Sequence, residues 1–141
     1  IMNFECQALG LSSLDKLVHA NVHGVIIVGL SGCGKRFLAR QYAKLLGVSN
    51  FNSISPTMQD VRNLTDTAST IEAPTVFCVE NMDTGVVSVA YPLLKLLEEC
   101  PANVYIVMTC SNLNQIPDTI ISRCSIVNVS MIFMIRSFFS F

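Results

Sequence analysis

Charge is scarce in this sequence, and neither sign prevails. Only 13% of its 141 residues are charged, with 9 basic residues against 10 acidic ones. A chain so balanced has no overall attraction to nucleic acid or to a membrane surface, so any contact with DNA needs a local patch. Hydrophobic residues make up 51% of the chain, which is typical of buried parallel strands or of faces covered by partners. The length corresponds to one domain with a sizeable core.

Closely spaced cysteine pairs and long apolar runs are missing as well. The six cysteines form no CxxC pair. Because a zinc site needs clustered ligands, we expect no zinc site among the cysteines and free thiols in a reducing cytoplasm. The apolar segment 131–141 is shorter than the roughly 20 residues that cross a bilayer, and no segment is laid out as a signal peptide. We therefore predict a cytoplasmic protein without membrane contact, with a core at 1–130 and a tail at 131–141 produced by truncation.

Glycine is rare too, yet three of the seven glycines stand in one loop. Residues 29–35 read GLSGCGK and directly follow the apolar run 25–28. Glycines let backbone N–H groups turn toward phosphate oxygens, and a following helix directs the positive end of its dipole to the same place. This order predicts a nucleotide-binding loop, although such turns also occur without a ligand. The expected contacts are Gly29, Gly32, Cys33, Gly34, Lys35 and Arg36.

The positions that hydrolysis requires are altered. Arg36 stands where such loops have a serine or threonine whose hydroxyl holds magnesium. The apolar strand expected at 75–79 is followed by Glu80, which can organise magnesium, and by Asn81, whose amide cannot polarise the attacking water. Ser111, after a later strand, can sense the terminal phosphate or simply cap a loop. We therefore predict a site that holds Mg²⁺ weakly and hydrolyses its bound nucleotide poorly.

Helices and strands alternate along the chain. The expected strands lie at 25–28, 51–54, 75–79, 104–109 and 125–129. The expected helices lie at 35–46, 56–67, 86–100 and 117–122, after a helix that opens with the capping box 12–15. Apolar strands in this order predict an α/β fold, a three-layer sandwich with a parallel sheet. Its ligands bind at the carboxyl ends of the strands, where the glycine loop, Glu80 and Ser111 all fall.

Two local features refine the expected helices. Ser55 is expected to cap the helix at 56–67, with Pro56 at its first position. Pro92 falls within the helix expected at 86–100, and we expect it to kink that helix or to delay its start.

Four segments carry a specific combination of motifs. They are HGVIIVGLSGCGKRFLARQYAK at 23–44, the strand end at 76–83, LLKLLEECPAN at 93–103 and PDTIISRC at 117–124. Together they resemble the clamp-loader branch of the AAA+ ATPases: the delta-prime and gamma/tau subunits of bacterial DNA polymerase III and the small subunits of replication factor C. Most other families with a phosphate loop lack the LEE-x-P and SRC segments. The resemblance implies an AAA+ core whose lid and collar domains are absent from this chain.

The resemblance also implies a function. Subunits of this branch form an open ring of five that binds ATP between neighbours, opens a sliding clamp and places it on primer–template DNA. By motif match, Glu80 and Asn81 occupy the acidic pair, Ser111 the sensor position, and Arg123 is an arginine finger acting in a neighbour's site. The implied cofactor is ATP. The implied partners are the other subunits, the sliding clamp and the DNA backbone, for which Arg62 is the best candidate contact.

The altered positions favour a subunit of delta-prime type. Such a subunit binds ATP weakly or does not hydrolyse it, but still supplies Arg123 to a neighbour, where a finger is worth about 10³-fold or more in rate. Two alternatives stay open: an active gamma/tau-type ATPase that tolerates Arg36 and Asn81, and an interaction module that keeps only the fold. Arg123 and Arg62 also have an ordinary interpretation as surface arginines of solvated helices.

Overall fold

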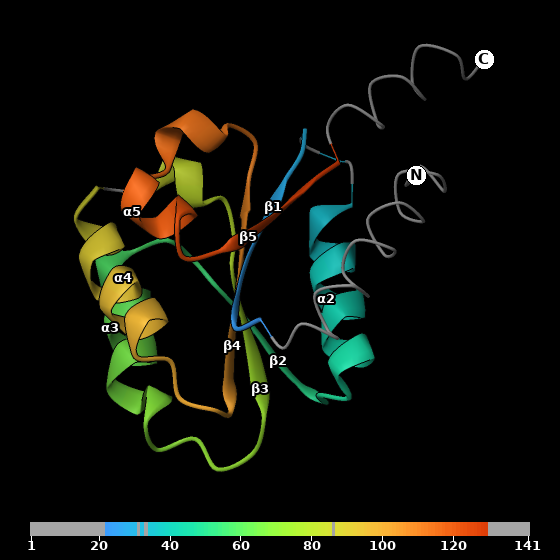
Figure 1. The fold of residues 1–141 in the computed structure, drawn as a ribbon, viewed down its shortest axis with the longest axis vertical. Coiled ribbons are helices and arrows are strands. Elements are labelled where there is room, and N and C mark those ends of the chain that lie inside the picture. The colour runs from blue at the N-terminus through green and yellow to red at the C-terminus, as the bar shows by residue number, and fades with distance from the viewer. Residues whose placement is uncertain (1–21, 31, 33, 86, 130–141) are drawn as a thin grey trace.

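Five parallel strands form one sheet in the order β2-β3-β4-β1-β5 (Figure 1). The computed structural model describes residues 22–30, 32, 34–85 and 87–129. The strands are β1 (Gly24–Val28), β2 (Asn50–Ile54), β3 (Thr75–Val79), β4 (Val104–Cys110) and β5 (Ser125–Asn128). The helix expected after the capping box 12–15 and the tail 131–141 lie outside the described residues.

Helices cover both faces of the sheet, which confirms the α/β three-layer sandwich. The helices are α2 (Lys35–Leu46), α3 (Met58–Ala68), α4 (Ala90–Glu98) and α5 (Asp118–Ile121). Figure 1 shows α2 on one face and α3, α4 and α5 on the other. Because successive strand residues point to opposite faces, Val25 and Ile27 pack with α2, whereas Ile26 and Val28 share a core with the other three helices. All five residues of β1 are buried, as its apolar sequence predicts.

The two local expectations have different outcomes. The cap expected at Ser55 is wrong: the N-cap of α3 is Thr57, whose hydroxyl accepts from the N–H of Asp60 at 3.3 Å. The Asp60 carboxylate accepts in turn from the N–H of Ser55 at 3.1 Å, so the helix starts two residues later than its proline indicates. The delayed start at Pro92 is confirmed. A 3-10 turn at Val87–Val89 precedes α4, and the proline lies in the first helical turn, where no helical N–H bond is lost.

The cysteines that the structure describes are free thiols. Cys78 and Cys110 are buried, and Cys100 and Cys124 are half-buried. Burial raises the pKa of Cys78 and of Cys124 to about 12, so both thiols stay protonated and unreactive at neutral pH. Among the described helices, none is long and apolar enough to cross a membrane.

Two substitutions in α4 separate the buried from the exposed face of this helix. Leu93 is fully buried between α4 and the sheet, whereas Tyr91 is 74% exposed. We expect Leu93→Ala to lower the free energy of unfolding by about 2–5 kcal/mol, because it leaves a cavity in the core. Tyr91→Ala, the matched control, should change it by no more than about 0.5 kcal/mol. Urea denaturation followed by circular dichroism measures both, and equal losses would contradict this packing.

Candidate functional site

Three strand ends and the glycine loop meet at one edge of the sheet. β1 and β3 both pair with β4, with Val28 opposite Cys110 and Val79 opposite Met108. The residues that follow these strands therefore lie side by side. They surround a hollow of about 430 Å³, lined by Gly32, Gly34, Lys35, Arg36, Phe37, Glu80, Asn81 and Thr109. Ser31 and Cys33 of the loop lie outside the described residues.

The loop backbone has the conformation that glycine permits. Gly32 and Gly34 have φ angles of 84° and 90°, in the left-handed region. A Cβ at Gly32 would meet no atom within 4 Å, so this position needs glycine for its backbone angle and not for space. Gly34 is the N-cap of α2, and as a glycine it has no side chain to cap the first turn. The N–H groups at the start of a helix lack helical partners and are available to an anion.

Lys35 connects the loop to the end of β4. Its Nζ donates to the carbonyl of Gly29 at 2.5 Å and to Ser111 Oγ at 3.3 Å. The first contact is to the loop itself and the second to the predicted sensor serine. The structure thus brings the predicted lysine and serine together at the mouth of the loop, where an ammonium group can act as a point charge for phosphate.

Arg36 and Glu80 form a two-pronged ion pair across the hollow. Arg36 Nε donates to Glu80 Oε1 at 2.9 Å, and Nη2 donates to Oε2 at 2.7 Å. These hydrogen bonds lower the pKa of Glu80 below its usual range and raise the pKa of Arg36, so both groups are charged at neutral pH. The side chain of Glu80 is 23% exposed and that of Arg36 is 61% exposed. Glu80 was expected to be open to magnesium, but both of its oxygens are engaged by the guanidinium.

Magnesium does not fit this set of donors. It requires oxygen ligands in octahedral geometry. Arg36 brings a positive charge where a hydroxyl would be, and the carboxylate of Glu80 is already neutralised. The nearby carboxylate of Asp83 is engaged too, since its Oδ2 accepts from the backbone N–H groups of Ser111 and Asn112 at 3.1 Å each.

Asp83 and Thr109 are the structural supports that the sequence did not reveal. Asp83 lies in the first turn of a 3-10 helix, as an ordinary helix-start carboxylate would, yet it fixes the end of β4. Thr109 is buried, and its Oγ1 accepts from the N–H of Asn81 at 3.0 Å. Asn81 itself has a left-handed backbone with a φ of 56°. A polar residue inside an otherwise apolar strand was the signal that could have found Thr109.

Arg123 is not part of the lining of the hollow. It follows α5 and is 41% exposed, with Nη2 at 3.6 Å from Glu98 Oε2 of α4. Arg62 is exposed on α3. Neither arginine is drawn into the core, so both side chains are accessible at the surface.

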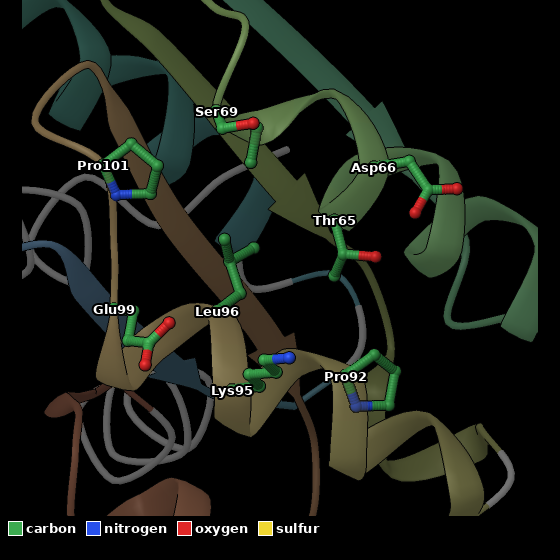
Figure 2. Close-up of a pocket in the computed structure, with 9 residues that line it drawn as sticks. Thr65, Asp66, Ser69, Pro92, Lys95, Leu96, Glu99 and Pro101 are labelled. Carbon is green, nitrogen blue, oxygen red and sulfur yellow. The ribbon is translucent and has the colours of Figure 1, made fainter.

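A second hollow lies between α3 and α4 (Figure 2). Its volume is about 310 Å³, and its lining includes Asp66, Lys95 and Glu99. None of the predicted site residues lines it, and it shares no residue with the hollow at the glycine loop. The predicted phosphate-loop residues and the residues after β3 therefore lie at the first hollow, whereas Arg123 lies outside both hollows.

The family described as "DNA polymerase III, delta subunit" matches residues 55–132, more than half of the chain. The chain belongs to this family. The match contains Glu80, Asn81, Ser111 and Arg123, and it begins after the glycine loop. No curated protein matches the chain.

Solved structures agree with the family in their fold. A DNA polymerase III gamma subunit-related protein of Thermotoga maritima has a TM-score of 0.70 at 20% identity, over 90% of this chain and 48% of that one. The RuvB Holliday junction branch migration motor of the same organism has a TM-score of 0.69 at 17% identity, over 92% of this chain and 45% of that one. These likenesses confirm the fold, an α/β sandwich with a parallel sheet. The chain spans about half the length of both proteins.

The ion pair predicts how Glu80 titrates. In Arg36→Gln we expect the pKa of Glu80 to rise, because the carboxylate loses its charged donor. Since the pKa of Glu80 is lowered in the folded state, the pair stabilises the fold at neutral pH, and this contribution disappears as the pH falls through that lowered pKa. Carboxyl ¹³C NMR titration measures the shift. Arg40→Gln is the control, because Arg40 acts on Glu80 only weakly and at a distance. A pKa that is unchanged in Arg36→Gln, or shifted equally in both variants, would contradict the assignment.

Proposed function

We propose that this chain is a clamp-loader subunit of delta-prime type for DNA replication. It binds the phosphates of ATP through the glycine loop, does not hydrolyse ATP efficiently, and supplies Arg123 to the ATP site of a neighbouring subunit. Membership of the DNA polymerase III delta family supports the replication role. The observation that carries the poor hydrolysis is the ion pair of Arg36 with Glu80.

The binding part of the proposal rests on four groups around one hollow. The uncapped first turn of α2 offers N–H groups to an anion. Lys35 exchanges its contact with Ser111 for phosphate oxygen, and Arg36 adds a second positive charge. Gly32 has the left-handed backbone that allows loop N–H groups to turn toward phosphate. A nucleotide is the ligand class that such a loop takes.

Poor hydrolysis follows from the two residues after β3. The carboxylate of Glu80 is held by a guanidinium, and Asn81 has no group that accepts a proton at neutral pH. Water near the terminal phosphate therefore has no general base from this strand. The subunit keeps its partner ATPases active through Arg123 and not through its own site.

Arg123 is suited to act outside its own chain. Its contact with Glu98 is long and exposed, and such surface pairs contribute only about 0–1 kcal/mol, so a stronger anion can take its place. A planar guanidinium binds phosphate oxygens in pairs. We propose the other clamp-loader subunits, the sliding clamp and primer–template DNA as partners in the cytoplasm, with Arg62 as a contact to the DNA backbone.

A reconstituted ring tests the role of Arg123. The ring combines the full-length protein with the ATPase subunits of its own replication complex, of which only the adjacent one keeps an active site. We expect Arg123→Ala to slow single-turnover ATP hydrolysis at that site by about 10³-fold. Glu98→Gln, which keeps the arginine, should leave the rate unchanged.

Three results would contradict the proposal. An Arg123→Ala ring that hydrolyses ATP as fast as the wild type would show that Arg123 is not an arginine finger. ATP turnover by the isolated subunit at the rate of an ordinary ATPase would favour a gamma/tau-type enzyme instead. A protein that neither binds nucleotide nor enters the ring would be an interaction module that keeps only the fold.

A further inference from the structure

We propose that the guanidinium of Arg36, held by Glu80, takes the place of the magnesium ion, so that this site binds the free nucleotide and not its magnesium complex. The inference rests on the proposed nucleotide binding and specifies the form of the ligand. It starts from the position of the pair: both side chains line the hollow that also contains Gly32, Gly34 and Lys35.

The geometry of the pair fixes the direction of the guanidinium. Two parallel hydrogen bonds, at 2.9 and 2.7 Å, hold one edge of the planar group against Glu80. A guanidinium has more N–H donors than these two bonds use. Because 61% of the Arg36 side chain is exposed, the remaining donors can meet a ligand in the hollow. Glu80 thus positions the arginine in the way that it would otherwise position a metal ion.

The charges of the site favour a metal-free anion. A divalent cation at this place would lie beside the guanidinium, and like charges at such short range repel. It would also need the oxygens of Glu80, which are already bound. Among the described residues, no group of three histidine, cysteine, aspartate or glutamate side chains could hold a metal ion. Lys35 and Arg36 together supply the positive charge that phosphate oxygens require.

A binding titration with and without magnesium tests the inference. A fluorescent ATP analogue is titrated into the full-length protein in buffer with MgCl₂ and in buffer with EDTA. For the wild type we expect the same or tighter binding in EDTA. Arg36→Ser restores the hydroxyl and frees Glu80, so its binding should become at least tenfold weaker in EDTA than in MgCl₂. Lys35→Ala should weaken binding in both buffers.

The outcomes separate this inference from the function on which it rests. Wild-type binding that is lost in EDTA overturns the inference and leaves nucleotide binding intact. Arg36→Ser binding that stays independent of magnesium also overturns it. No saturable binding in either buffer overturns the proposed nucleotide site and this inference with it. Thermal unfolding of each variant, followed by circular dichroism, distinguishes a loss of binding from a loss of the fold.

Discussion

The ion pair between Arg36 and Glu80 decides what the glycine loop can do. It connects the start of α2 to the end of β3, and it places a fixed positive charge at the point where hydrolysis needs a metal ion. A site with this pair can still attract phosphate through the helix N-terminus and Lys35. It lacks both the ligands for magnesium and a base for water. In the function that we propose, binding and hydrolysis, which usually depend on one site, are thereby separated.

The parallel sheet brings these groups together. The glycine loop, Glu80 and Ser111 come from different parts of the chain. They meet at one edge of the sheet because β4 lies between β1 and β3. Polar contacts hold the residues beyond the strand ends, where Asp83 accepts from two N–H groups after β4 and Thr109 accepts from the N–H of Asn81. The apolar core sets the positions of the strands, and these contacts set the positions of the residues after them.

Much of the fold could be predicted because it depends on local patterns. Continuous apolar runs predicted buried parallel strands, and Pro92 predicted the late start of α4. The cap of α3 was predicted at the wrong residue, because Ser55 and Thr57 both suit that role. Only the contacts of Asp60 separate them: its N–H donates to the Thr57 hydroxyl, and its carboxylate accepts from the N–H of Ser55. The sequence indicated that Arg36 was an unusual neighbour of a phosphate loop and that Glu80 was an ordinary acid able to organise magnesium. It could not reveal that they bind each other, since 44 positions separate them.

Crystals of the protein with ATP and MnCl₂, measured at the manganese absorption edge, test the central role of the ion pair most directly. We expect phosphate density at the glycine loop, Arg36 still bound to Glu80, and no anomalous peak between Glu80 and the phosphates. A manganese peak at that place, with Glu80 as its ligand and Arg36 turned away, would contradict this role.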